Sequence, residues 1–394
     1  MNKQSFADLG VSPVVARALR ERGLESPFPV QASVIPDALA GHDVLVKSPT
    51  GSGKTLALGV PLVDRIEATD ARAAALVLAP TRELASQIVD EIRPIASARA
   101  LSVAAVYGGV GFERQIKQAR KAHILVATPG RLEDLIARGA VRLDRVRVLA
   151  LDEADRMLDM GFRPAVDRIV ARVPRDRQTL FLSATLDGEA GRIAAKYTRD
   201  ARRHEHAPKG ESRVDIEHRF VAMAHEDKLD SLVRVLRGED GGRTLVFVRT
   251  KRGADRLVKR LAKRGVEAAA MHGDKSQSQR EKALRRFHSG AVAALVATDV
   301  AARGIDVDGI TQVVNFDAPE DRETYVHRVG RTGRAGNTGV GVTFVIHDQA
   351  RDVGKIAHEL RLHAQFEQSG LGSIGSRHGE RRHPSRRRRR SRVR

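Results

Sequence analysis

A glycine turn between an apolar run and a helix start constrains this chain more than any other stretch. Val44-Leu45-Val46 precedes the segment Ser48-Pro49-Thr50-Gly51-Ser52-Gly53-Lys54-Thr55, and Leu56-Ala57-Leu58 follows it. The two glycines let the backbone curl so that successive N–H groups point inward, and the following helix adds its positive amino-terminal end. Such a strand, loop and helix form a cradle for phosphate oxygens.

The charged and hydroxyl side chains of this loop predict a nucleoside triphosphate site. Lys54 supplies a mobile positive charge for the terminal phosphates, and Thr55 places a hydroxyl where Mg²⁺ bridges them. The strict pattern begins with glycine, whereas this chain has Ser48 at that position. The alternative is a plain glycine turn beside a surface lysine, which the flanking strand and helix patterns disfavour.

A second cluster of charge follows a buried strand. Val148-Leu149-Ala150-Leu151 leads directly into Asp152-Glu153-Ala154-Asp155. Buried carboxylates need a cation or hydrogen bonds, so Asp152 is the expected second anchor of Mg²⁺. Glu153 could orient and deprotonate an attacking water. Alone, the tetrapeptide could be an acidic turn that caps the next helix; the phosphate loop favours the catalytic interpretation.

Two series of short apolar strands alternate with helical stretches, which predicts an α/β protein with two mostly parallel sheets flanked by helices. We expect a first domain over residues 1–205, a linker over 206–213, a second domain over 214–366 and a disordered Arg-rich tail over 367–394. Only the first domain carries a phosphate loop. The expected strands are 44–46, 76–79, 124–127, 148–151 and 180–182, then 244–248, 266–271, 292–297, 313–316 and 342–346.

Composition narrows the functional class. The 394 residues include no Cys and no apolar run of about 18 residues, which excludes disulfides and argues against a membrane span, and a cytoplasmic location is expected. The net charge is +20, and residues 376–394 contribute ten Arg against one Glu. This excess predicts a polyanionic partner, most simply nucleic acid. A merely solubilising charge is the alternative for the body of the chain.

Asp152-Glu153-Ala154-Asp155 and a series of further motifs resemble the DEAD-box ATP-dependent RNA helicases. The motifs occur in that family's order over about residues 6–347, and the family has a small residue at the Ser48 position. The short body and basic tail look most like the bacterial RhlE-like branch. The matching segments are Pro80–Ala85, Gly108-Gly109, Thr128–Arg131, Ser183–Thr185, Val246–Val248, Gln277 with Arg280, Ala297–Asp299, Arg303–Asp306 and His327–Arg334.

The resemblance implies two tandem RecA-like domains and assigns ATP to matching positions. It implies that Gln31 hydrogen-bonds the adenine edge, that Phe6 packs on the base, and that Asp306 contacts the ribose. Leu24 stands where the family often has an aromatic residue. The implied nucleotide contacts are Phe6, Gln31, Ser48, Thr50, Gly51, Ser52, Gly53, Lys54, Thr55, Asp306, Arg331 and Arg334.

The same resemblance implies the catalytic and coupling residues. Lys54, Glu153, Arg331 and Arg334 are the implied catalytic set, with the two arginines acting as fingers on the γ-phosphate. Asp155, Ser183, Thr185 and His327 would couple the domains. RNA contacts to phosphate and sugar are implied for Thr81, Arg82, Gly109, Thr128, Arg131, Arg249, Thr250, Thr298 and Arg303, although several of these could equally be helix caps.

The resulting interpretation is an RNA-stimulated ATPase that uses ATP and Mg²⁺ to unwind short RNA duplexes locally and to remodel RNA or ribonucleoproteins. A DNA-directed helicase of the same architecture and an RNA-annealing protein acting through its basic surface are the alternatives. Ribonucleoprotein or RNA-degradation proteins are candidate partners, and a monomer without membrane association is expected.

Overall fold

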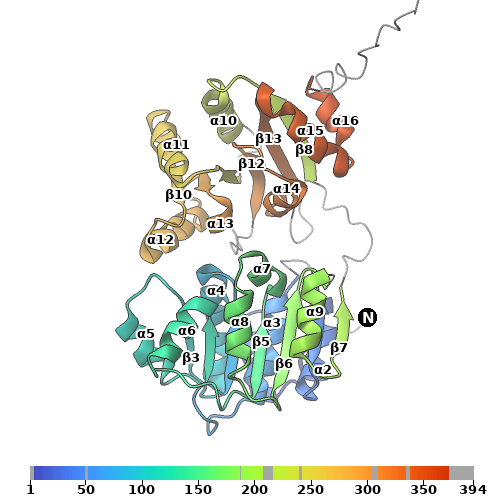
Figure 1. Cartoon of the computed structure of the whole chain (residues 1–394), viewed down its shortest axis with the longest axis vertical. Helices are drawn as coiled ribbons and strands as arrows, with labels where there is room; N and C mark the ends of the chain where they lie inside the picture. The colour runs from blue at the N-terminus through green and yellow to red at the C-terminus, as the bar shows by residue number, and fades with distance from the viewer. Residues whose placement is uncertain are drawn as a thin grey trace, which may run out of the picture. The chain divides into compact units, whose positions relative to one another are not determined.

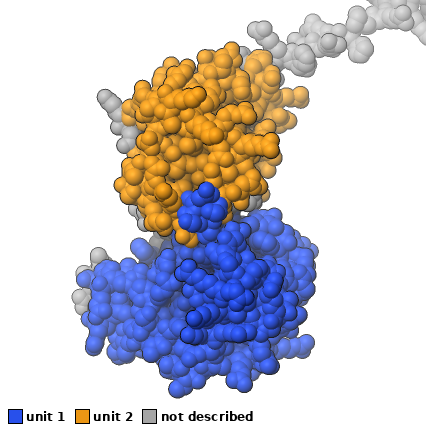
Figure 2. Space-filling model, turned by 90° about the vertical axis from the view of Figure 1, so that its left-hand side faces the viewer, with its two compact units in different colours: residues 1–213, 276–279, 301–306 blue, residues 214–275, 280–300, 307–394 orange. Residues whose placement is uncertain are grey.

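The computed structural model describes residues 4–48, 52–186, 188–206, 216–238, 242–302, 309–333 and 338–371. The chain divides into two compact units, the first over residues 1–213 and the second over most of residues 214–394 (Figure 2). Each unit contains one sheet, and every strand pair in both sheets is parallel within the described chain.

The first unit is built on a seven-stranded sheet (Figure 1). In spatial order the strands are β3 (Val103–Val106), β4 (Ile124–Ala127), β2 (Ala75–Leu78), β5 (Val148–Leu151), β6 (Gln178–Ser183), β1 (Val44–Lys47) and β7 (Arg202–Glu205). Strands β2, β4, β5 and β6 are wholly buried because helices cover both faces of the sheet.

Alternate residues of each strand face opposite helical layers. The helices are η1 (Ala7–Leu9), α1 (Pro13–Glu21), α2 (Pro29–Leu39), α3 (Lys54–Arg65), α4 (Arg82–Ala98), α5 (Phe112–Ala119), α6 (Pro129–Ala137), α7 (Ala154–Asp159), α8 (Arg163–Val170) and α9 (Gly188–Tyr197). Val77 packs in the hydrophobic cluster formed with α1 to α4, whereas its neighbours Leu76 and Leu78 pack in the cluster formed with α5 to α9.

The second unit has a six-stranded sheet with the same alternation of strand and helix. Its strands, in spatial order, are β10 (Ala268–Met271), β11 (Ala294–Ala297), β9 (Arg243–Phe247), β12 (Ile310–Asn315), β13 (Gly339–Val345) and β8 (Ile216–Ala222). Its helices are α10 (Lys228–Arg237), α11 (Lys251–Lys263), α12 (Gln277–His288), α13 (Asp299–Ala302), α14 (Arg322–Val329), η2 (His347–Gln349), α15 (Ala350–Glu359) and α16 (His363–Gln368).

The predicted fold class is confirmed, and the sequence pattern missed three strands. β3 is half alanine, β7 is the polar edge strand Arg202-Arg203-His204-Glu205, and β8 is an edge strand with mostly exposed residues. Edge strands bury little apolar surface, so they carry a weak pattern. None of the described helices is long and apolar enough to cross a membrane.

The expected linker and tail lie mostly outside the described residues. Residues 207–215 and 372–394 are among those not described, so the linker over 206–213 and the basic tail stay predictions. The described chain continues beyond residue 366, because α16 ends at Gln368 and Leu371 is 4% exposed. Packed structure in the second unit therefore reaches at least five residues past the expected domain end.

A partly buried histidine in β8 predicts acid sensitivity of the second unit. His218 Nδ1 lies 2.7 Å from the hydroxyl of Tyr325, and burial lowers the pKa of His218. Below pH 6.5 the unfolded chain binds a proton that the folded chain resists, so this contribution to stability is lost as pH falls through the lowered pKa. Urea unfolding at pH 7.5 and 5.0 should show a smaller pH effect in His218→Gln than in wild type. The exposed-site control His225→Gln should match wild type; equal pH effects in all three proteins would contradict this origin.

Candidate active site

The predicted catalytic, metal-binding and coupling residues of the first unit follow the carboxyl ends of neighbouring strands. Lys54 follows β1, Asp152 and Glu153 follow β5, and Ser183 to Thr185 end β6 and enter the next loop. The three strands are adjacent in the order β5-β6-β1. Parallel strands bring such loops to one edge of the sheet, where ligands bind in open α/β folds.

The ammonium group of Lys54 is hydrogen-bonded to the phosphate loop. Lys54 is 6% exposed, and its Nζ donates a hydrogen bond to the carbonyl oxygen of Ser48 at 2.6 Å. Ser48 Oγ donates to Ser52 Oγ at 2.7 Å. Thr55 occupies the next position of α3 and is partly exposed. The loop thus presents a cation and a hydroxyl at the sheet edge, as a phosphate and metal site needs.

Asp152 is a buried carboxylate whose charge interacts with that of Lys54. Burial raises the pKa of Asp152 to about 7, Lys54 opposes that rise, and Glu153 adds to it. A divalent cation at this carboxylate would stabilise its charged form. Mg²⁺ takes one or two carboxylates together with hydroxyl, water and phosphate oxygens, so Asp152 with Thr55 fits that ion.

The backbone conformation and the burial of Glu153 support its predicted role as a general base. Its backbone is in the left-handed region (φ 48°, ψ 53°), which costs energy for a residue with a side chain. Glu153 is 7% exposed, and its Oε2 is buried without a hydrogen-bond partner among the described residues, although Arg156 Nε lies 3.9 Å away. A buried carboxylate oxygen that accepts no hydrogen bond can accept a proton from a bound water.

Asp155 ties the acidic segment to the loop after β6. Its Oδ2 accepts hydrogen bonds from the backbone N–H groups of Ala184 at 3.0 Å and Thr185 at 3.1 Å. Ser183 Oγ donates to the carbonyl oxygen of Thr185 at 2.5 Å. The structure therefore brings together the three coupling residues of the first unit, while His327 lies in α14 of the second unit.

Gln31 is fixed beside the phosphate loop. It is 1% exposed, accepts a hydrogen bond from Phe28 N at 2.9 Å, and donates one to the carbonyl oxygen of Gly53 at 3.0 Å. Gly53 has φ 87°, and a side chain there would collide with Gln31 and Phe28. Gln31 keeps one amide hydrogen and acceptor capacity for a base edge. Phe6 is likewise buried, at 3% exposed within the core of the first unit.

Three of the predicted RNA contacts of the first unit lie at the other half of the same sheet edge. Arg82 begins α4 after β2, and its guanidinium lies over Gly109, where φ is 85° and a side chain would collide with it. Arg131 lies in α6 after β4; its Nη1 donates to Val110 O at 3.0 Å and Gln115 Oε1 at 2.8 Å. Burial lowers the pKa of Arg131. These basic groups can contact phosphate and sugar.

Two of the threonines predicted to contact RNA cap helices. Thr81 Oγ1 accepts from Leu84 N at 3.2 Å, and Thr250 Oγ1 accepts from Gly253 N at 3.0 Å. Thr128 stands at the start of α6 without a side-chain cap hydrogen bond and is 9% exposed. Thr81 and Thr250 therefore cap helices, an alternative that the sequence left open. Each capping hydroxyl still has its own hydrogen to donate.

In the second unit, Arg249 and Thr298 follow the adjacent strands β9 and β11. Arg249 N donates to Asp317 Oδ2 at 2.9 Å, and Lys228 Nζ donates to Asp317 Oδ1 at 2.7 Å. Thr298 is 7% exposed. Asp317 therefore fixes the backbone at which Arg249 leaves the sheet.

The arginines of the 327–334 segment have different environments. Arg328 is 3% exposed; its guanidinium pairs with Asp299 at 2.6 and 2.7 Å and donates to Asn315 and Asp317. Arg331 is 6% exposed, and His327 is exposed. The predicted site residues Thr50, Gly51, Arg303, Asp306 and Arg334 lie outside the described residues.

Sequence reasoning missed the residues that position the predicted ones. Gln115 and Phe112 hold Arg131 by a hydrogen bond and by ring contact at 4.0 Å from the guanidinium carbon. Asp317 positions Arg249. Phe112 and Gln115 lie on an ordinary amphipathic helix, and no local pattern marks them. Only knowledge of which loops meet would have identified them.

Two family models match the chain. The model described as "DEAD/DEAH box helicase" matches residues 28–193, and the model described as "Helicase conserved C-terminal domain" matches residues 227–336. The first covers the phosphate loop, acidic segment and Ser183–Thr185. The second covers Arg249, Thr298, His327 and Arg331.

Similar proteins carry consistent names. The DEAD-box ATP-dependent RNA helicase CshA of Geobacillus kaustophilus is 43% identical over 355 residues, covering 90% of this chain and 75% of that protein. The protein of the same name from Bacillus subtilis is 42% identical, covering 86% and 69%. The solved structure of S. cerevisiae Dbp5 bound to RNA and ADP BeF3 matches with a TM-score of 0.80 and 29% identity over 92% of this chain and 94% of that one.

Proposed function

Because this chain belongs to the DEAD-box ATP-dependent RNA helicase family, we propose that it hydrolyses ATP in response to RNA and thereby unwinds short RNA duplexes locally. The observation that carries the proposal is the buried Asp152 facing the charge of Lys54, with Glu153 beside it. The RhlE-like branch stays a prediction, since the compared bacterial relatives bear the name CshA.

The residues of the first unit divide the work of ATP hydrolysis. Lys54 would exchange its hydrogen bond to Ser48 for phosphate oxygens, and Thr55 with Asp152 would hold Mg²⁺. Glu153 would take the proton of the attacking water. Bound Mg²⁺ supplies charge stabilisation for the transferred phosphoryl group. The adenine edge would be recognised by Gln31, which keeps hydrogen-bonding capacity for it.

We propose that the second unit contributes Arg331 and Arg334 to the γ-phosphate, while Asp155, Ser183, Thr185 and His327 couple hydrolysis to the state of the RNA. The RNA strand would be held through phosphate and sugar by Arg82, Gly109 and Arg131 of one unit and by Arg249 and Thr298 of the other. Such contacts do not read sequence. The absence of Cys supports a reducing cytoplasm as the setting, and we propose a monomer.

The direct test measures ATPase activity against RNA and DNA of matched length and sequence at fixed salt. We expect RNA to raise turnover at least about tenfold over the unstimulated rate and single-stranded DNA to leave it nearly unchanged, because hydrogen bonds to the 2′-hydroxyl select RNA. Equal stimulation by DNA would support the DNA-directed alternative instead.

Removal of the basic tail gives a separate prediction. Deleting residues 376–394 removes ten Arg and one Glu, and the RNA concentration for half-maximal ATPase should rise several-fold with the saturated rate nearly unchanged. Titrating RNA at two salt concentrations measures this. The tethering role would be refuted by an unaltered RNA requirement at the lower salt concentration.

A further inference from the structure

A cavity of about 750 Å³ opens at the edge of the first sheet opposite the candidate ATP site. Its walls are the segments preceding β1, β5, β6 and β7, which are neighbours in the order β5-β6-β1-β7, together with the end of α3. The volume is in the range of small-molecule sites, about 300–1,000 Å³. The phosphate loop follows the other end of β1, about 13 Å away along that strand.

Two partly buried arginines in this wall are paired only with neutral groups. Arg65 Nη1 donates to Leu39 O at 2.9 Å, and Arg177 donates to Pro174 O at 2.9 Å and Tyr197 O at 3.3 Å. The Nε atoms of both arginines are buried without a hydrogen-bond partner in the described structure. Carbonyl oxygens satisfy donors but do not neutralise charge, so neither guanidinium is paired directly with a carboxylate in the described structure.

Neighbouring arginines further lower the pKa values of these two arginines. Burial lowers the pKa of Arg65, and Arg147 lowers it further. Burial also lowers the pKa of Arg177; Asp43 opposes that shift, and Arg199 increases it. Each buried guanidinium therefore stands near a second arginine of the same cavity, and an anion between them would relieve both the burial cost and the repulsion.

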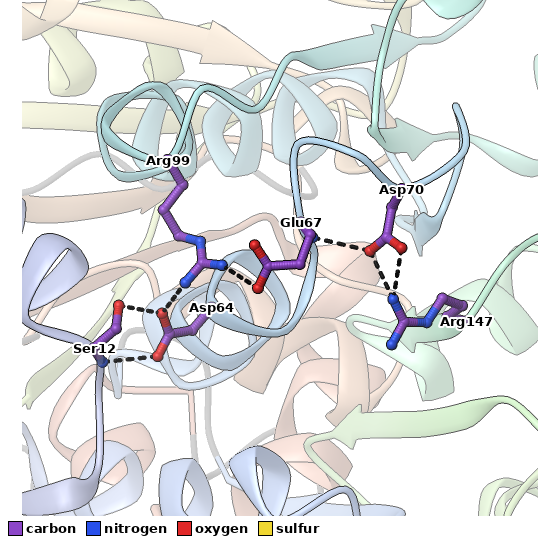
Figure 3. A network of polar contacts seen from close by, with 6 residues as sticks. All are labelled: Ser12, Asp64, Glu67, Asp70, Arg99 and Arg147. Atoms are coloured by element: carbon purple, nitrogen blue, oxygen red, sulfur yellow. Dashed lines mark hydrogen bonds and ion pairs between the residues drawn. The ribbon is translucent and has the colours of Figure 1, made fainter.

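A network of polar contacts engages the two acids nearest to Arg65 in sequence (Figure 3). The neighbours of Arg65 in sequence, Asp64 and Glu67, both accept hydrogen bonds from Arg99, at 2.9 and 2.6 Å. The network in Figure 3 comprises Ser12, Asp64, Glu67, Asp70, Arg99 and Arg147. These acids accept hydrogen bonds from other donors, and Arg65, which lines the cavity, has no ion pair to a carboxylate among the described residues.

The same network holds Arg147 in the wall. Arg147 Nη1 donates to both oxygens of Asp70 at 2.7 Å, and Asp70 accepts from Glu67 N at 2.9 Å. Arg145 and Arg199, also in the wall, are exposed and have no ion pair to a carboxylate among the described residues. The cavity thus combines one arginine that is held by an ion pair with two exposed arginines that have none.

Two of the carboxylates in the cavity wall already accept hydrogen bonds. Asp43 accepts from Thr179 N and Arg199 N, both at 2.7 Å, and Asp144 accepts two hydrogen bonds from Arg142. Asp176 and Asp200 are exposed. An anion among the partly buried guanidinium groups would therefore meet Asp43, which is bonded to two donors, and three carboxylates in contact with solvent.

The wall also offers an acceptor that lacks a donor. Gln178 is 6% exposed, and its Nε2 donates to Ala38 O at 2.8 Å and His42 O at 2.7 Å. Its Oε1 is buried and accepts no hydrogen bond from the described chain. A ligand with a hydroxyl or amino group could satisfy this oxygen.

We propose that this cavity binds a phosphorylated small molecule, with phosphate oxygens on Arg65, Arg145, Arg177 and Arg199 and a hydroxyl or amino group on Gln178 Oε1. The planar guanidinium fork matches phosphate geometry. A small molecule is favoured over an RNA strand because the site is a cavity of limited volume rather than an extended groove. The site is separate from the proposed ATPase and does not depend on it.

The test titrates inorganic pyrophosphate into the full chain by calorimetry without Mg²⁺. All proteins carry Lys54→Ala, which removes the phosphate-loop cation, so remaining binding reports on other sites. We expect one binding event, weakened at least about tenfold by Arg145→Gln with Arg199→Gln. The control Arg175→Gln, on the exposed loop between Pro174 and Asp176 but outside the cavity, should bind like the parent. Basic residues of the C-terminal tail are common to all variants and cancel in the comparison.

Three results would overturn the proposal. The first is no saturable binding in the Lys54→Ala parent. The second is an equal loss of binding in Arg175→Gln and in the Arg145→Gln/Arg199→Gln variant, which would indicate general surface charge. The third is unchanged pyrophosphate binding with weakened binding of a single-stranded RNA, which would assign this surface to RNA. Circular dichroism of each variant checks folding, which these exposed replacements should preserve.

Discussion

Glu153→Gln should lower ATP turnover about 10²–10⁴-fold, the usual loss when a general base is removed. Glutamine has nearly the same shape and keeps an oxygen where Glu153 Oε2 is now buried without a hydrogen bond, but it cannot accept the proton. ATP and RNA binding should persist, so the variant should accumulate in complex with both. Steady-state ATPase assays and RNA retention in the presence of ATP measure the two effects.

A matched control separates this role from a general loss of charge. Glu113→Gln on α5 changes an exposed carboxylate in the same unit and should leave turnover within about twofold of wild type. Turnover by Glu153→Gln close to that of wild type would remove Glu153 from the mechanism. If wild type lacks RNA-stimulated turnover and anneals RNA as well as Glu153→Gln does, the annealing alternative would replace the motor.

Arg328→Ala should destabilise the second unit by about 3–5 kcal/mol, the cost of removing one partner from a buried ion pair. Arg328 is 3% exposed and satisfies Asp299, Asn315 and the Asp317 carbonyl together, while its guanidinium carbon lies 5.1 Å from the centre of the Phe247 ring. Its removal leaves these acceptors without their donor. The melting transition of the second unit should fall by roughly 10 °C in scanning calorimetry.

The neighbouring Arg322 provides the comparison. Arg322 begins α14, is exposed and has no ion pair in the described structure, so Arg322→Ala should shift the transition by no more than about 1–2 °C. If Arg328→Ala instead keeps wild-type stability and loses ATPase activity, Arg328 acts on the nucleotide rather than on the fold. Arg331→Ala should behave in that second way if its proposed catalytic role is correct.

The structure brings several predicted site residues close together because the signal is local, while their roles stay predictions. The placement of Lys54 beside Ser48 and of Asp152 beside Glu153 depends on contiguous residues at the end of a strand, and parallel strands carry their loops to one edge. The apolar runs also indicated ten of the thirteen strands found in the described residues. The three others are edge strands that are rich in alanine, polar or mostly exposed, so their apolar pattern is weak.

Residues that depend on distant segments could not be assigned in this way. The sequence places Arg328 and Arg331 in one periodic basic segment, yet the structure pairs Arg328 with Asp299, 29 residues away. Phe6 lies in the core, and its expected contact with a base stays a prediction. The cavity that combines Arg65, Arg145 and Arg199 draws on segments up to 134 residues apart and has no motif.

The sequence alone determined the fold class, the family and the order of the phosphate and acidic motifs, because each of these is written in short contiguous patterns that specify local backbone. Only the tertiary structure decided which charged groups are neutralised, since that depends on which distant side chains share a buried space. Arg65 illustrates the difference: two acids lie close to it in sequence, but both are bonded to Arg99.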